Sequence, residues 1–126
     1  ETQYDDKGKV LKTIQISLSV ILGAIAAHKL KEFLNEDSLK SFETGVKYMM
    51  YHGLAMIIIS NSNIQSKNNL LLIFSVGIVL FSFSIFLLST QSITKINFSF
   101  LGPITPIGGL TLIIGWIIFI INSFKI

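Results

Sequence analysis

Glu43, Lys47, Tyr51 and His52 are the residues whose types and spacing could carry out chemistry. They recur at helical spacing and lead directly into the apolar run 56–59. If the helix ends just after this run, His52 lies about 12 Å inside it, close to the middle of a hydrocarbon layer about 30 Å thick. An ionisable side chain at that depth is costly, and it is by default a sign of function.

One hypothesis is a path for protons or ions through His28, Glu43, Tyr51 and His52, because such groups form proton relays in membrane proteins. The alternative is structural. In it, His52 stays neutral and hydrogen-bonds to a serine, to Thr105 or to a carbonyl, while Glu43 and Lys47 pair near the interface. The structural alternative is favoured because the other apolar segments contain no acidic residue.

Metal and catalytic sites are not expected. His28, His52 and Glu43 are suitable ligand types for zinc or iron, but no two of them have the close spacing of a metal-binding pair on one helix. Axial haem ligation would require both histidines at one depth. The sequence has no Cys and no Gly-x-Ser-x-Gly motif, so a nucleophile for hydrolysis is also missing. We expect no cofactor, no metal and no enzymatic activity.

The composition predicts a membrane protein. Of 126 residues, 51% are hydrophobic and only 13% are charged, and the mean hydropathy is +0.68, whereas soluble domains are about one quarter charged. After a polar tail at 1–12, four segments could span a membrane: 13–28, 42–60, 70–90 and 106–124. A cleaved signal peptide is the competing interpretation of the first segment. The predicted fold is all-α, a single transmembrane domain that forms an integral membrane four-helix bundle.

Signals at the segment ends refine this prediction. Residues 28–34 read as a short amphipathic segment that lies in the interface before the second span. Asn35 is placed to cap the helix that follows it. At the last span, Thr105 is placed to cap and Pro106 to occupy the first helical position.

Small residues recur on three of the predicted spans, a pattern that lets membrane helices approach closely. Four helices cannot obviously satisfy all of these stripes among themselves, so partner helices are expected, in a larger complex or a homo-oligomer. The stripes are Ser19, Gly23 and Ala27; Ser75, Ser82 and Ser89; and Gly108, Thr111 and Gly115.

The charge of +3 comes from lysines that stand singly between apolar blocks. Nucleic-acid binding, which requires a concentrated basic face, is therefore not expected. The lysines divide evenly between the two ends of a four-span bundle, so the charge bias that normally sets orientation is absent.

Three stretches resemble the domain-of-unknown-function 423 family, which includes small bacterial inner-membrane proteins and the eukaryotic transmembrane protein 256. They are GAIAAHKLK at 23–31, FETGVKY with YHGLA at 42–55, and LGPITPIGG at 101–109. Ala26 replaces a family Gly, and Lys29 replaces an Ala. The resemblance covers roughly residues 18–120 and implies a four-helix integral membrane protein in a bacterial plasma membrane or a mitochondrial inner membrane. It implies no reaction.

The predicted function is that of a non-enzymatic accessory or structural subunit, in contact with membrane lipids and with other transmembrane helices. The alternative is a small conduit or transporter with a proton-linked site at His52 and Glu43.

Overall fold

The computed structural model describes residues 2–64 and 66–124, and within these ranges it contains helices and no strand. The first helical run comprises α1 (Thr2–Ile25), the π-helical turn η1 (Ala26–Leu30) and α2 (Lys31–Phe33). The second is α3 (Glu36–Ser60), and the third comprises α4 (Lys67–Ile78), the π-helical turn η2 (Val79–Phe83) and α5 (Ser84–Ser89). The chain then forms α6 (Gln91–Thr94), the 3-10 turn η3 (Ser99–Leu101) and the last long helix, α7 (Ile104–Ser123).

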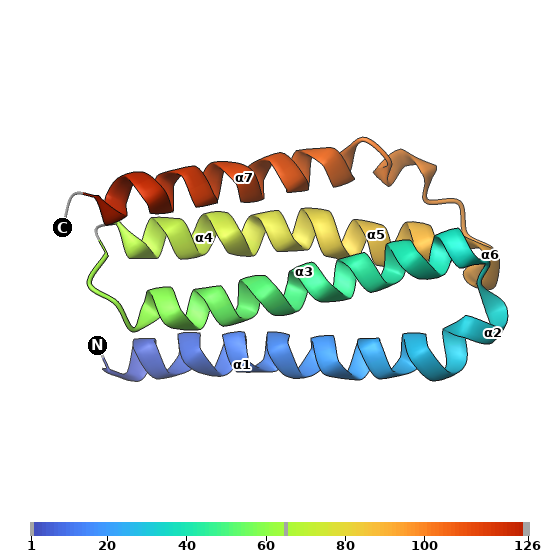
Figure 1. Ribbon diagram of the computed structural model, residues 1–126, viewed down its shortest axis with the longest axis horizontal. Helices are drawn as coiled ribbons and strands as arrows, with labels where there is room; N and C mark the ends of the chain where they lie inside the picture. Colours follow the sequence, from blue (N-terminus) through green and yellow to red (C-terminus); the bar gives the residue numbers. More distant parts are fainter. Residues whose placement is uncertain (1, 65, 125–126) are drawn as a thin grey trace.

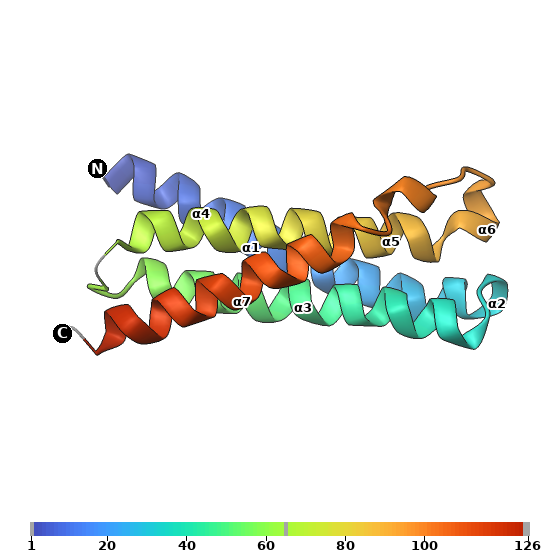
Figure 2. The ribbon, with the colours of Figure 1, turned by 90° about the horizontal axis from the view of Figure 1, so that it is seen from above.

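The four long runs lie side by side, each antiparallel to the one before it (Figure 1). α1 packs on α3, α3 packs on the α4–η2–α5 run, and α7 packs on α4 and η2. Seen from above, α7 crosses the bundle diagonally (Figure 2). The second run, α3, therefore lies between the first run and the third.

Three of the runs are long and apolar enough, by length and composition, to cross a membrane: Lys12–Phe33, Lys67–Ser89 and Ser99–Ser123. The prediction of an all-α integral membrane protein is confirmed. α3 has 25 residues but is not among these three. Its charged residues, which fall in its first half, lower its hydropathy. The predicted second span at 42–60 thus stays a prediction.

Helix ends match the sequence signals in part. Asn35 caps α3 as predicted, because its side-chain oxygen accepts a hydrogen bond from Ser38 N at 2.8 Å. The predicted start of the last helix is wrong: α7 begins at Ile104, its cap position is Pro103, and Thr105 provides no cap. Pro106 is consequently the third helical residue, a position it can occupy because the first-turn N–H groups have no partner within a helix.

The segment predicted as a polar tail belongs to α1, which already begins at Thr2. Extending an existing helix by a residue costs much less than nucleating a new one, so a helix that forms in the apolar segment can propagate outward into polar residues.

Glycines hold α7 close to the third run. A Cβ atom on Gly108 would lie 2.5 Å from Phe81 N in η2, and one on Gly115 would lie 2.8 Å from the Phe74 ring in α4. Buried Ser82 donates a hydrogen bond to Gly45 O in α3 at 2.8 Å. Gly108, Gly115 and Ser82, which belong to two of the three stripes, thus pack inside this chain. The stripes do not by themselves require a second protein, contrary to the argument drawn from the sequence.

Gly108 and Gly109 form a matched pair for testing this contact. Gly108→Ala should lower the free energy of unfolding by about 1–3 kcal/mol, because the methyl group meets backbone that cannot turn away. Gly109→Ala should be neutral or stabilising by up to about 1 kcal/mol, because its nearest neighbour is a Phe81 ring atom at 3.5 Å. Reversible unfolding in detergent micelles measures both. Equal effects would contradict the close packing of α7 on η2.

Candidate functional site

His52 is the buried polar centre of the structure. It lies on α3 with 5% of its surface exposed, beyond the middle of the helix. The rings of Phe74 and Trp116 meet it edge-on, with centroids 5.4 and 5.7 Å away, and the Tyr48 ring stacks at 6.0 Å. Three helices, α3, α4 and α7, therefore surround the imidazole with aromatic rings.

Both imidazole nitrogens of His52 have hydrogen-bond partners. Trp116 Nε1 donates to His52 Nε2 at 3.0 Å, and His52 Nδ1 lies 2.8 Å from Tyr48 O. An indole can only donate and a carbonyl can only accept, so Nε2 is unprotonated and Nδ1 carries the proton. His52 is therefore the neutral Nδ1–H tautomer, with its hydrogen-bonding capacity fully used. A second proton, on Nε2, would break the bond to Trp116.

The position of Trp116 depends on the glycine that precedes it. Gly115 is buried against Phe74, so α7 approaches α4 closely at this level. Trp116, the next residue, is then directed toward α3, and its ring also lies 5.1 Å from Phe74. The hydrogen bond between Trp116 and His52 joins α7 to α3.

A groove between α3 and α7 runs past this pair. It encloses about 600 Å³ and is mainly apolar, with Tyr48 and His52 on the α3 side, Phe81 from η2, and the α7 side from Pro106 to Trp116. A second hollow of about 430 Å³ lies toward the start of α7 and is also lined by Pro106. Its polar lining comes from the start of α3, from Ser89 and from Thr105. We call these two hollows together the α3–α7 groove.

The structure brings together only some of the predicted site residues. Thr105 and Pro106 lie at the polar end of the α3–α7 groove, and His52 lies at its apolar end. Glu43 is half-buried and Lys47 is exposed. Glu43 precedes His52 by nine residues, which at 3.6 residues per turn places it on the opposite face of α3.

The remaining candidates are peripheral. Tyr51 is 57% exposed. His28 is exposed and lies in η1, near the end of the first run, while His52 is deep in α3. Within the described ranges, no group of three or more His, Cys, Asp or Glu side chains could hold a metal ion. The proposed relay residues therefore do not form a continuous line.

Sequence reasoning missed Trp116, whose indole is the partner of His52. It also missed Phe74, whose ring is buried, and Phe81, which lines the groove. The sequence did contain a signal: Trp116 follows directly after Gly115, and an indole N–H in lipid requires an acceptor. Which acceptor it finds depends on the crossing of α7 over α3, which no local pattern specifies.

The sequence that contains this site matches a known protein family. A family described as "Protein of unknown function (DUF423)" matches residues 22–109. The chain belongs to the DUF423 family. The matched region contains Tyr48, His52 and the polar end of the α3–α7 groove, and it ends seven residues before Trp116.

Three similar proteins illustrate the relationship. UPF0382 membrane protein SH2409 of Staphylococcus haemolyticus is 39% identical over 92% of this chain and 93% of its own length. UPF0382 membrane protein YwdK of Bacillus subtilis is 37% identical over 92% of this chain and 94% of its own length. A UPF0382 membrane protein of Haemophilus influenzae is 36% identical over 94% of this chain and 96% of its own length. No solved structure matches the chain.

These names state a membrane location and no activity. Together with the three long apolar runs, they identify this DUF423 protein as a small integral membrane protein with bacterial relatives.

The tautomer of His52 gives a direct test of the site. In ¹⁵N-labelled protein at neutral pH, we expect Nδ1 to show a protonated shift and Nε2 an unprotonated one, because the partners fix the proton on Nδ1. In a double-mutant cycle of His52→Leu and Trp116→Phe, the coupling energy should lie between about 0.6 kcal/mol, the average for hydrogen bonds between membrane helices, and about 1.7 kcal/mol, the maximum. A coupling indistinguishable from zero, or the opposite tautomer, would remove the link between α3 and α7.

Proposed function

We propose that all four long runs cross the membrane, α3 included, and that the protein acts without enzymatic activity through the packing of its helices with those of other membrane proteins. The position of α3 in the bundle supports the proposal that it crosses the membrane. It lies alongside both α1 and α4, and its length of 25 residues exceeds the roughly 20 that a span needs. Exposed Lys47 can reach the interface by extending its side chain along the helix.

Cysteine labelling tests the fourth crossing, because the chain contains no Cys of its own. Glu32→Cys, Asn63→Cys and Asn97→Cys each place a thiol at an exposed position in a connection or a short helix. If α3 crosses, a membrane-impermeant maleimide should label positions 32 and 97 from one side and position 63 from the other. Labelling of 32 and 63 from the same side, with 97 opposite, would show that α3 does not cross.

An outward-facing strip on α1 supports the proposed packing with helices of other membrane proteins. Thr13, Ser17 and Ala24 are exposed and recur at i, i+4 and i+11, so they share one side of the helix. The other side faces α3, where Gln15 donates a hydrogen bond to Met49 O at 2.8 Å. Lipid tails are as apolar as helix side chains, so close approach at small residues is a main cause of helix association in membranes. We call these three residues the α1 outer strip.

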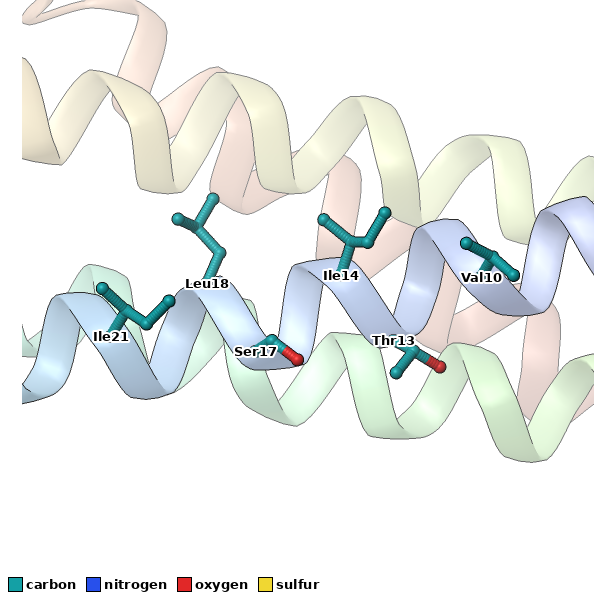
Figure 3. Close-up of a pocket in the computed structure, with 6 residues that line it drawn as sticks. All are labelled: Val10, Thr13, Ile14, Ser17, Leu18 and Ile21. Atoms are coloured by element: carbon teal, nitrogen blue, oxygen red, sulfur yellow. The ribbon is translucent and has the colours of Figure 1, made fainter.

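A hollow of about 420 Å³ lies beside the α1 outer strip. Figure 3 shows Val10, Ile14 and Leu18 projecting from α1 on the side toward α4, with Thr13 and Ser17 lower on the helix; all five residues line the hollow. A partner helix that packs against the strip would have room for its larger side chains in this hollow. This combination favours an accessory subunit of a larger complex, or a homo-oligomer.

The native size of the protein tests this proposal. Extracted from its own membrane in mild detergent, the wild type should migrate well above its 14.0 kDa mass, with its partners identified by mass spectrometry. Ala24→Leu should reduce the assembly, because the added bulk separates the helix backbones. Leu72→Phe, which adds bulk at a position of α4 that is 63% exposed, is the control and should leave the assembly intact. A wild type that migrates as a monomer would contradict the proposal.

The conduit hypothesis has less support from the geometry. His52 has both nitrogens engaged, and Glu43 lies on the opposite face of α3. A proton path would need Trp116 to withdraw before His52 could accept a proton. A pH-dependent flux through the reconstituted protein that is lost in His52→Gln would favour the conduit over the packing role.

A further inference from the structure

The α3–α7 groove has the shape of a site for one amphiphilic molecule. Its polar hollow is lined by Asp37, Ser41 and Thr105, among others, and its apolar hollow by Gly109 and Ile113, among others. Pro106 lines both, so the two hollows adjoin at this residue of α7. On α3, the positions that line them lie on one strip, because 37, 41, 48 and 52 are separated by near-multiples of the helical turn.

The length of the groove corresponds to one leaflet of the membrane. Eleven residues separate Ser41 from His52 on α3, and eleven separate Thr105 from Trp116 on α7. At 1.5 Å per residue each stretch is about 17 Å long, compared with about 15 Å for half of the hydrocarbon layer. The groove therefore extends from the interface to about the midplane, where the hydrogen bond between Trp116 and His52 joins its two sides.

Its lining selects the chemical class of the ligand. Among the residues that the structure describes, Asp37 is the one charged residue that lines the polar hollow, and hydroxyl groups such as that of Ser41 lie beside it. A carboxylate favours a cation and repels an anion, while hydroxyl groups can donate to phosphate oxygens. We propose that the α3–α7 groove binds a phospholipid with an ammonium headgroup, of the phosphatidylethanolamine type, with one acyl chain along the apolar hollow.

A helix of another protein does not fit this groove. A helix is about 10 Å wide with its side chains and must continue through the whole membrane, whereas the two sides of the groove are joined halfway by His52 and Trp116. An acyl chain is thin and ends within its own leaflet. The proposal depends on α3 crossing the membrane, which the cysteine labelling tests independently, and it does not depend on any protein partner.

The first test fills the apolar hollow. The purified full-length protein is incubated with vesicles of phosphatidylethanolamine and phosphatidylglycerol in equal amounts, and the lipid it retains is identified by native mass spectrometry. Wild type should retain one phosphatidylethanolamine. Gly109→Leu should lose it, because the new side chain enters the groove, while Ile114→Phe on the opposite face of α7 should retain it. Retention by Gly109→Leu at the level of wild type would overturn the proposal.

The second test removes the charge at the polar end. Asp37→Asn should retain phosphatidylethanolamine and phosphatidylglycerol about equally, because the carboxylate that discriminates between them is gone. Glu36→Gln is the matched control: it removes a carboxylate from the same turn of α3 but from a residue that does not line the groove, so it should keep the preference. A wild type without preference, or a preference unchanged in Asp37→Asn, would overturn the assignment of the headgroup.

Discussion

The hydrogen bond from Trp116 to His52 is the interaction on which the arrangement of α3 and α7 depends. In lipid, an imidazole or an indole N–H without a partner has no water to bond with, so each group requires the other. This requirement fixes where α7 crosses α3. It also leaves the two helices separated on either side of the contact, and on one side that separation is the groove. One hydrogen-bonded pair thus determines both the crossing and the cavity beside it.

The other contacts that hold the helices together are close approaches of the backbone and single polar contacts. Because lipid tails are as apolar as leucine, burying apolar side chains gains little in a membrane, and packing and polar contacts must hold the helices together. Here Gly108 lies against the backbone of η2, Ser82 bonds to Gly45 O and Gln15 bonds to Met49 O. Each contact requires a small residue or a single polar group at one position. This explains why small residues recur on the runs without any need for a partner at every stripe.

Local signals allowed the helical class and some helix ends to be predicted, because hydropathy, length and capping act within a few residues. Asn35 illustrates this success. The predicted start of α7 was wrong because Pro103 and Pro106 can both lie near a helix start, and sequence alone does not decide between them. The identity of the partner of His52 could not be predicted, since it joins residues 64 positions apart and depends on the crossing of two helices.

The π-helical turn η2 follows from the spacing of the buried residues in the third run. These recur at every fourth position, and in a regular α-helix such a series drifts around the axis by about 40° per step. After four steps the last member would face away from the first. A π-helical turn takes more residues than an α-helical turn and so reverses part of the drift. The members are Leu70, Phe74, Ile78, Ser82 and Phe86, all of them buried.

The π-helical turn η2 explains how the third run contacts α3 along its whole length. Phe74 contacts His52 at one level, and Phe86 lies 4.8 Å from the Phe42 ring at the other. Within η2 itself, Ser82 turns toward α3 while Phe81, its neighbour, turns toward the groove and packs 5.1 Å from Tyr48. A regular helix could not keep Phe74 and Phe86 on α3 and also direct Phe81 into the groove. The irregular turn therefore forms part of the floor of the site, and it is where the packing of the bundle and the shape of the groove are set together.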